Sequence, residues 1–493
     1  MNILRIHPDD NVAVALSDIK KDTVINENES AVMTTEDITK GHKVALFDIA
    51  KGDKVIKYGN AIGTATADIT KGSHVHVHNM KTALSETSEY EYQPVSMPLR
   101  PCKKRTFKGY KRADGSVGIR NELWIIPTVG CVNNIAEKLA ASAAYPADGR
   151  VDGVYAFTHP YGCSQMGDDH AVTRKILAGL AKHPNAGGVL ILSLGCENLT
   201  KEQFIDELGT YDDRRVKFLT CQEETDELAK GKSILEELAA YAGSFEREDI
   251  DASELTVGLK CGGSDGLSGV TANPVVGGFS DRLVAMGGST ILTEVPEMFG
   301  AEKILFNRCM DRDTFDRAVL MVNDFKKYYT DHGQVVYENP SPGNKAGGIT
   351  TLEDKSCGCV QKGGTAPVVD VLEYGDHVKH KGLTLLSGPG NDLVSTTALT
   401  VAGAHLILFT TGRGTPFGAP VPTVKISSNT GLYDRKCGWI DFNAGVVADG
   451  TGSIDETADA LTELVLEIAS GKKSRQELSG YRGIAILKDG VTL

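Results

Sequence analysis

From about residue 108 onward, the chain alternates short apolar runs with amphipathic segments. The apolar runs have almost no polar interruption, which is typical of parallel strands buried on both faces. Between them, segments such as 170–183 and 223–242 repeat apolar positions at helical spacing. This alternation predicts a parallel α/β architecture. We expect strands at ELWIIPTVGC, GVYAFTHPYGC, GGVLILSLGC, VKFLTC, LTVGLKC, STILTEV, TLLSGPG and AHLILFT.

The first eighty residues follow a different pattern, a repeat of Asp-Ile-X-Lys-Gly followed by alternating apolar and polar residues. Copies begin at Asp37, Asp48 and Asp68, and a copy without the glycine begins at Asp18. Lys-Gly after an apolar pair predicts a tight turn with glycine at positive φ. We therefore expect a small all-β domain over residues 1–80.

Two stretches predict the remaining domain boundaries. Residues 81–107 have little periodicity and three prolines, as a linker would. The acidic stretch 245–255 follows a long helical segment. We therefore expect a second α/β domain at 108–250 and a C-terminal α/β domain at 251–493, with a short strand near the C-terminus, in 479–493, packed back on that domain.

Charge and composition narrow the function. The net charge of the 493 residues is −13 and no basic run offsets it, which disfavours a nucleic-acid partner. No apolar stretch approaches the roughly 18–20 residues that span a bilayer, so no membrane association is expected. The start of the chain lacks the order of regions found in a signal peptide, which favours a cytoplasmic location. In a reducing cytosol the ten cysteines should be thiols or ligands rather than disulfides.

The positions of the cysteines are more informative than their number. Five of them end an apolar run: Cys131, Cys163, Cys196, Cys221 and Cys261. Ligands of open α/β sheets bind at the carboxyl ends of the strands, so thiols there suggest site chemistry. The alternative is that each is a small buried hydrophobe. Ligands of an iron centre could come from separate strand ends, and Cys357-Gly-Cys359 could also hold a soft metal.

Histidines form a second candidate group. In His74-Val-His76-Val-His78 the three imidazoles would share one side of a strand. Neutral imidazole is a common ligand for iron, manganese or zinc, and His42 from the preceding repeat could join them. An exposed polar edge of the β domain is the alternative.

Other loops carry groups suited to acid–base chemistry and anion binding. Residues 161–170 hold a thiol, two carboxylates and His170, which we expect to be a neutral base or metal ligand in the first turn of a helix. The glycine-rich loop 261–269 can present N–H groups to a small carboxylate, and no nucleotide-binding motif is present. Arg413 can pair bidentately with a carboxylate. Asn344, Lys345 and Lys355 would suit a hydroxylated anion, although such loops are usually only surface.

Taken together, the motifs resemble the altronate/galactarate dehydratase family over essentially the full length. The resemblance rests on GHKVALFDIAKGDKVIKYG, HVHVHN, RNELWIIPTVGCVN, YGCSQMGDDH, LGCEN, CGGSDGLSGVTANP, LTEVPEMFGAE, YENPSPGNKAGGITTLEDKS and TGRGTPFG. It implies an α/β protein with a SAF-type β-clip domain at the N-terminus and a Rossmann-like parallel sheet in the C-terminal domain.

The resemblance also implies a hydro-lyase that removes water across C2 and C3 of a sugar acid. D-altronate would give 2-dehydro-3-deoxy-D-gluconate in hexuronate breakdown, and galactarate is the alternative substrate. It further implies Fe²⁺, with Mn²⁺ as a possible substitute, and a homodimer; it favours Cys359 over Cys357 as a ligand. One iron ion and an iron–sulfur cluster both stay open. A sugar-acid sensor without turnover and an NAD-dependent dehydrogenase are the alternatives from other classes.

The site residues expected from these motifs fall into three groups. Those expected to act in catalysis are His170, Lys355 and Asp169. Those expected to bind substrate are Arg413, Thr415, Asn344, Lys345 and Asn198. Those expected to bind metal are His74, His76, Cys163, Cys261 and Cys359.

Overall fold

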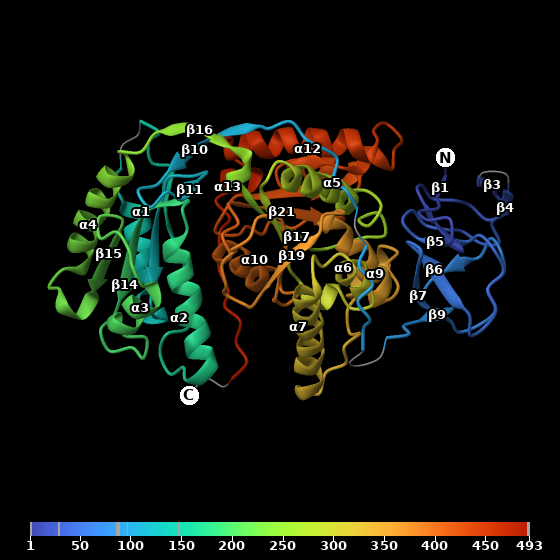
Figure 1. The fold of residues 1–493 in the computed structure, drawn as a ribbon, viewed down its shortest axis with the longest axis horizontal. Coiled ribbons are helices and arrows are strands. Elements are labelled where there is room, and N and C mark those ends of the chain that lie inside the picture. The colour runs from blue at the N-terminus through green and yellow to red at the C-terminus, as the bar shows by residue number, and fades with distance from the viewer. Residues whose placement is uncertain (1, 28–29, 85–88, 96, 146–147, 491–493) are drawn as a thin grey trace.

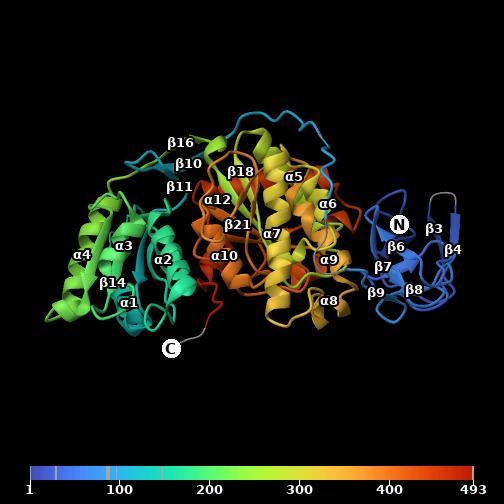
Figure 2. The same cartoon turned by 60° about the horizontal axis from the view of Figure 1, so that its bottom comes forward.

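A computed structural model describes residues 2–27, 30–84, 89–95, 97–145 and 148–490. The chain folds into three bodies in a row, with the C-terminal α/β domain in the middle (Figure 1). The N-terminal β domain and the second α/β domain lie at its opposite ends in both views (Figure 2). Among the described residues, none of the helices combines the length and apolar character that crossing a lipid bilayer requires.

The N-terminal domain consists of short strands, as its repeat predicts. Its strands are β1 (Ile3–Leu4), β2 (Val12–Ala15), β3 (Val24–Glu27), β4 (Ser30–Met33), β5 (Lys43–Ala45), β6 (Lys54–Lys57), β7 (Asn60–Ala65), β8 (His74–Val75) and β9 (Met80–Lys81). They form antiparallel sheets in the orders β1-β2-β5-β8, β3-β4 and β6-β7-β9. The family resemblance to a SAF-type domain is thus matched by an all-β body.

The repeat has a structural purpose that the spacing alone did not reveal. Its copies pair, with Ile19 bridged to Ile38 and Ile49 bridged to Ile69. Within each pair, the aspartate of one copy accepts the backbone N–H of a lysine in the other, at N···O distances of 2.7–2.9 Å. The repeat glycines adopt positive φ, as expected of a tight turn, and Asp22 does so in the copy without glycine.

The second domain is a parallel sheet covered by helices. Its strands β12 (Glu122–Pro127), β13 (Gly153–Ala156), β14 (Ala186–Ser193) and β15 (Val216–Thr220) lie in the order β13-β12-β14-β15. The helices are α1 (Asn133–Ser142), α2 (Gly167–Lys182), α3 (Lys201–Leu208) and α4 (Glu227–Ala242), with 3₁₀ turns η1 (Gly130–Val132) and η2 (Cys221–Glu223). All strand pairs are parallel, which confirms the predicted α/β class.

The segments that enter and leave the second domain run side by side. Strands β10 (Thr106–Lys111) and β16 (Arg247–Asp251) pair antiparallel, and β11 (Val117–Gly118) completes the sheet. This small sheet was not predicted, because β10 begins in the presumed linker, β16 lies in the acidic boundary stretch and β11 has only 2 residues. It joins the second domain to the C-terminal domain.

The C-terminal domain is built on a seven-stranded, all-parallel sheet in the order β19-β20-β18-β17-β21-β22-β23. The strands are β17 (Thr256–Cys261), β18 (Ser289–Leu292), β19 (Val368–Leu372), β20 (Leu383–Leu386), β21 (Leu406–Thr411), β22 (Thr423–Ser427) and β23 (Phe442–Asn443). They are almost entirely buried, as their continuous apolar runs predict. This is the doubly wound architecture that the resemblance implied.

Helices cover both faces of that sheet. They are α5 (Ala272–Ala285), α6 (Glu302–Phe306), α7 (Arg312–Asp331), α8 (Pro342–Ala346), α9 (Leu352–Cys359), α10 (Asp392–Val401), α11 (Thr430–Arg435), α12 (Ile454–Ala469) and α13 (Arg475–Leu478). The 3₁₀ turns are η3 (Ala252–Glu254), η4 (Val295–Glu297), η5 (Val360–Gly363) and η6 (Gly445–Val447).

The strand predicted near the C-terminus is wrong. Residues 479–490 contain no strand, and residues 491–493 lie outside the described part of the chain. Ile484 and Ile486 are nevertheless buried in a core shared by the second and C-terminal domains. Backbone N–H groups of Asp489 and Gly490 donate to the Asp169 carboxylate instead of to a ladder. The tail therefore packs back on the fold through side chains and this contact rather than by strand pairing.

Candidate active site

The topology of the C-terminal sheet indicates at which edge a ligand would bind. The chain leaves β17 for β18 on one side and later places β21 on the other side of β17. Ligands of open α/β sheets bind beyond the carboxyl ends of strands at such a switch point. Here that position is formed by the loops after β17 and β21, residues 262–269 and 412–416. The N–H groups of Gly412 and Arg413 both donate to the carbonyl of Gly263 at 3.1 Å, which ties the loops together.

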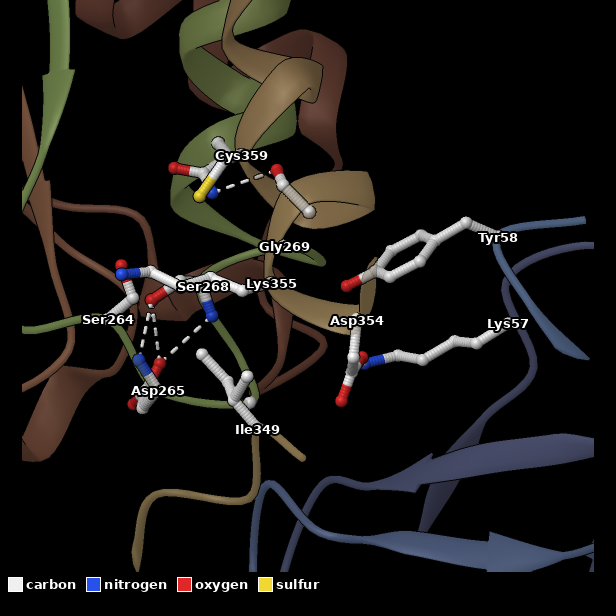
Figure 3. Close-up of a pocket in the computed structure, with 13 residues that line it drawn as sticks. Lys57, Tyr58, Ser264, Asp265, Ser268, Gly269, Ile349, Asp354, Lys355 and Cys359 are labelled. Atoms are coloured by element: carbon white, nitrogen blue, oxygen red, sulfur yellow. Dashed lines mark hydrogen bonds and ion pairs between the residues drawn. The ribbon is translucent and has the colours of Figure 1, made fainter. Parts of the chain in front are cut away.

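The N-terminal β domain covers this edge. In Figure 3, Lys57 and Tyr58 reach from that domain toward Asp354 and Lys355 of α9 and the loop around Asp265. These side chains and Cys359 line a small cavity between the domains. It holds only about 10 Å³, room for one water molecule. A larger ligand therefore requires some separation of the two domains.

At the inner end, two thiols and one carboxylate converge. The Cys261 and Cys359 thiols donate to Glu297 Oε2 at 2.9 and 3.1 Å, and the two sulfurs lie 3.5 Å apart. Among the residues the structure describes, this is the only trio of Cys, His, Asp or Glu side chains whose ligand atoms all lie within 4.8 Å of one another. All three are buried. The arrangement is a possible metal-binding site.

Buried lysines surround the trio. Lys362 Nζ lies 2.8 Å from Cys261 Sγ, and Lys355 Nζ lies 2.7 Å from Glu297 Oε1. The three ammoniums of Lys260, Lys355 and Lys362 face the three carboxylates of Glu294, Glu297 and Asp392. These three positive and three negative charges cancel. A divalent cation bound by two thiolates would add two positive and two negative charges, so the net charge of the cluster would stay the same. The donor set and its surroundings therefore fit a divalent metal.

Burial and hydrogen bonding favour the protonated form of the Cys359 thiol. The hydrogen bond to Cys261, together with burial, raises the pKa of the Cys359 thiol well above its ordinary value. Burial opposes the charge of Lys355, but Glu297 outweighs it and raises the pKa of the ammonium. Lys355 is therefore a permanent positive charge at the cavity wall, which argues against its predicted role as a base.

On the other wall, two lysines share one carboxylate. Lys43 Nζ lies 2.8 Å from Asp354 Oδ2, and Lys57 Nζ lies 3.0 Å from Asp354 Oδ1. The lysines come from β5 and β6 and the aspartate from α9, so this contact also docks the N-terminal domain. All three side chains are at most 3% exposed, so solvent does not screen the repulsion between the ammoniums.

Burial lowers the pKa of Lys43 to about 8 from its ordinary 10.5; Asp354 opposes this effect and Lys57 adds to it. Burial also disfavours the charge of Lys57, but Asp354 outweighs it and raises that pKa. Because both amines bind the same carboxylate, the lowered value belongs to the pair. One proton of the pair is therefore lost at mildly alkaline pH.

A more open cleft leads away from the cavity, and Asp265 lines both. The cleft has a volume of about 490 Å³ and is lined by the cationic side chains of Lys40, Arg413 and Arg435. Asp265 itself is held by Ser268, Ser428 and Asn429. Cationic walls at a switch point favour an anionic ligand.

The histidines cluster, but not on a strand. Strand β8 ends at Val75 and residues 77–79 form a turn, so the predicted strand through His78 is wrong. The rings of His42, His74 and His76 still lie 4.9–5.4 Å apart, and a 2.9 Å hydrogen bond joins His42 Nδ1 to His74 Nε2. Burial, with the neighbouring imidazoles, lowers the pKa of His74 to about 3. The rings are neutral, and metal binding by His74 and His76 stays a prediction.

Several expected site residues lie elsewhere. Cys163, Asp169, His170 and Asn198 belong to the second domain, at the opposite end of the molecule from the N-terminal domain (Figure 1). Asp169 accepts N–H groups from the C-terminal tail, and Asn198 accepts the Ser164 N–H at 2.8 Å. The structure therefore does not bring these four together with Lys355, Cys261 and Cys359.

The remaining expected substrate ligands lie near the switch point but are partly engaged in folding. Asn344 donates to the Ser264 carbonyl at 2.8 Å and so ties α8 to the glycine-rich loop. The Lys345 carbonyl contacts His76 Nε2 at 3.0 Å, and Thr415 accepts a hydrogen bond within its own loop. Arg413 lines the cleft, as its expected role requires.

The sequence analysis missed the acidic and basic partners in the cavity. Glu297, Lys362, Lys43, Lys57 and Asp354 lie in four separate segments. Glu297 lies in the motif LTEVPEMFGAE and Asp354 lies in LEDKS. No rule of sequence spacing predicts that these two motifs lie together in the fold. The one local signal was the density of charged residues in otherwise apolar, buried segments.

Comparison with known proteins agrees over the whole chain. Residues 1–83 match the model for the altronate/galactarate dehydratase SAF domain, 109–243 match the second domain of D-galactarate dehydratase/altronate hydrolase, and 252–492 match the D-galactarate/altronate dehydratase C-terminal domain. Altronate dehydratases of Escherichia coli (strain K12) and Bacillus subtilis (strain 168) are 52% and 51% identical, with both chains covered completely. A galactarate dehydratase (L-threo-forming) of Escherichia coli (strain K12) is 34% identical over 95% of this chain and 93% of its own.

Proposed function

The chain belongs to the altronate/galactarate dehydratase family, and we propose on that premise that it is a hydro-lyase that converts D-altronate to 2-dehydro-3-deoxy-D-gluconate in hexuronate breakdown. The observation that carries the proposal is identity above 50% over the full length of two altronate dehydratases. The cation-lined cleft at the switch point supports an anionic substrate.

The difficult step is removal of the weakly acidic C2 proton, because negative charge then builds on the adjacent carboxylate. A positive group fixed beside that carboxylate stabilises the charge without reorganising. Lys355 meets this requirement, since Glu297 and Asn339 hold its ammonium at 2.7 and 3.0 Å at the cavity wall. We assign it this electrostatic role rather than the role of base.

Lys57 is our candidate for the base. It lines the cavity, and with Lys43 it forms a pair that loses one proton with a pKa of about 8. In the state where Lys43 keeps the shared proton, the neutral amine of Lys57 can accept the proton from C2. That proton can then leave with the C3 hydroxyl as water, and the enol relaxes to the ketone unaided.

The C3 hydroxyl is a poor leaving group. Ferrous iron held by Cys261, Glu297 and Cys359, with manganese as a possible substitute, would supply a Lewis acid for that oxygen. Around it, Lys362 and Lys355 hold the sulfur and the carboxylate of the ligand set in place. The buried position excludes bulk water from the reacting atoms.

Substrate capture is assigned to the outer cleft. Arg413, with Lys40 and Arg435, attracts the sugar acid and leads it past Asp265 toward the cavity. Because the cavity is small when the domains are closed, release of the Lys43 and Lys57 contacts to Asp354 is expected to accompany entry. We further propose a homodimer and a cytoplasmic location, testable by light scattering and by cell fractionation.

The test is a panel of hexonates and hexarates incubated with anaerobically iron-loaded protein, with formation of 2-keto acid as the readout. We expect D-altronate to be turned over with the highest kcat/KM. Galactarate is the second candidate, because the three cations of the cleft could also accept a second carboxylate. If D-altronate binds but no 2-keto acid forms, the protein is a sugar-acid sensor and not an enzyme. If NADH forms when NAD is added, the protein is a dehydrogenase and not a dehydratase.

A further inference from the structure

Three exposed thiols lie at one edge of the second domain. Cys131, Cys163 and Cys196 are three of the four exposed cysteines among the described residues. Cysteine is among the residues most often buried, so three exposed ones in a single domain are unusual. Each follows a glycine and each belongs to the loop after a different strand, β12, β13 or β14.

The topology brings these loops together. Strand β12 lies between β13 and β14, and the chain leaves β12 for β13 on one side before placing β14 on the other. This is again a switch point, where open α/β sheets bind ligands. Adjacent strands are about 4.8 Å apart, so the three loops are neighbours at one edge of the sheet. It is separate from the edge that the N-terminal domain covers.

Hydrogen bonds between the loops make the arrangement rigid. The Gly130 N–H donates to the Tyr161 carbonyl at 2.9 Å, which joins the loop of Cys131 to that of Cys163. The Ser164 N–H donates to Asn198 Oδ1 at 2.8 Å, which joins the latter to the loop of Cys196. At Gly162, with φ +97°, a Cβ would lie 1.9 Å from the Thr128 carbonyl oxygen, so the close approach of the loops requires glycine.

The three thiols are not placed closely enough for a single ion to bind all of them. Thiolates on a single ion lie about 4 Å apart, because each metal–sulfur bond is about 2.3 Å. Cys131, Cys163 and Cys196 are not among the side chains whose ligand atoms all lie within 4.8 Å, whereas Cys261, Glu297 and Cys359 are. An iron–sulfur cluster, in which each thiolate binds a different iron, spans wider separations.

Two unpartnered polar atoms point to an absent ligand at this edge. Asn133 Oδ1 and His170 Nε2 are buried polar atoms without a hydrogen-bond partner, and both residues are on the helices that follow the loops of Cys131 and Cys163. The fourth strand-end thiol, Cys221, is buried, and burial raises its pKa to about 11. It differs from the three exposed thiols in this burial and is not part of the proposed ligand set.

We propose that Cys131, Cys163 and Cys196 hold a [4Fe–4S] cluster through three thiolates, leaving one iron without a protein thiolate. This site lies outside the active site assigned above, and Asn198 serves it as a positioning residue for the Cys163 loop. The cluster does not depend on turnover, so its test is separate from that of the proposed function.

The experiment reconstitutes the full chain anaerobically with sulfide and equal amounts of ferrous and ferric iron, the ratio that a [4Fe–4S]²⁺ cluster contains. We expect about four irons and four acid-labile sulfides per chain, a broad visible charge-transfer band and an electron paramagnetic resonance signal after reduction. The variants C131S, C163S and C196S should each lose the sulfide and the signal. C437S changes the fourth exposed cysteine and should keep both.

Two controls test whether the variants stay folded and whether the thiols of Cys261 and Cys359 hold the cluster instead. Because the three side chains are exposed, the serine variants should keep the circular dichroism and melting behaviour of the parent. A C261S/C359S variant should keep the sulfide-containing cluster. Any of three results would overturn the proposal: no labile sulfide in the parent, a cluster that survives the loss of all three thiols, or a cluster lost in C261S/C359S instead.

Discussion

Replacing Lys43 with methionine tests the assignment of the base. Lys43 is fully buried and shares the Asp354 carboxylate with Lys57, and the pair loses a proton with a pKa of about 8 instead of 10.5. In K43M the repulsion between the ammoniums is gone and Asp354 holds Lys57 alone. The pKa of Lys57 should then be at least as high as that of an ordinary lysine.

The magnitude follows from that difference. A pair that loses one proton with a pKa of about 8 contains one neutral amine in about a tenth of the molecules at pH 7, and kcat/KM should rise about tenfold toward pH 9. In K43M the remaining amine of Lys57 has a pKa of 10.5 or more, so the fraction of molecules with a neutral amine at pH 7 falls by about 300-fold relative to the pair. We expect kcat/KM of K43M at pH 7 to be lower than that of the parent by about this factor. The rise of kcat/KM with pH should move to above pH 10.

The assay is the pH dependence of kcat/KM for iron-loaded protein with D-altronate. Stability should change little, because Asp354 and Lys57 remain paired in the variant. K54M alters an exposed lysine of the same domain and serves as the control. A folded K43M with the parental pH profile would refute the reasoning and remove Lys57 as the base.

Four other substitutions test three separate parts of the site. D354N leaves both lysines that it pairs with buried and unneutralised, so it should destabilise docking of the N-terminal domain by roughly 3–5 kcal/mol, measured by chemical denaturation; unchanged stability would contradict the buried pairing. R413A should raise KM roughly 10- to 150-fold by removing a charged hydrogen bond, with little change in kcat, and steady-state kinetics would expose the opposite pattern. C261S or C359S, loaded with ferrous iron without sulfide, should bind much less iron by elemental analysis, whereas C437S should match the parent; equal occupancy would rule out the thiol site.

Much of the fold follows from local rules. Continuous apolar runs ending in cysteine become buried parallel strands, and Cys261 does end β17 at the switch point. The Asp-Ile-X-Lys-Gly copies become tight turns because glycine and one aspartate accept positive φ. The errors occur where tertiary contacts replace ladder pairing: β8 ends at Val75, and the C-terminal tail binds Asp169 without forming a strand.

The site itself could be predicted only in part. Cys261, Cys359, Lys355 and Arg413 were expected from motifs, and all four lie around the same edge of the C-terminal sheet. Their partners were missed because they are assembled by long-range packing. Glu297 lies in a 3₁₀ turn that follows Glu294, whose φ of +69° is unusual for a residue with a side chain. No periodic pattern in the sequence predicts this left-handed backbone conformation at Glu294.

The central claim is that dehydration occurs where the N-terminal β domain covers the switch point of the C-terminal sheet. The most direct measurement is a crystal structure of K57M, prepared anaerobically with ferrous iron and D-altronate, in which loss of the base should preserve the substrate. We expect anomalous scattering from iron beside Cys261, Glu297 and Cys359, and the sugar acid between Lys355 and Arg413. A sugar acid bound instead at the carboxyl edge of the second domain, beside Cys131, Cys163 and Cys196, would contradict the claim.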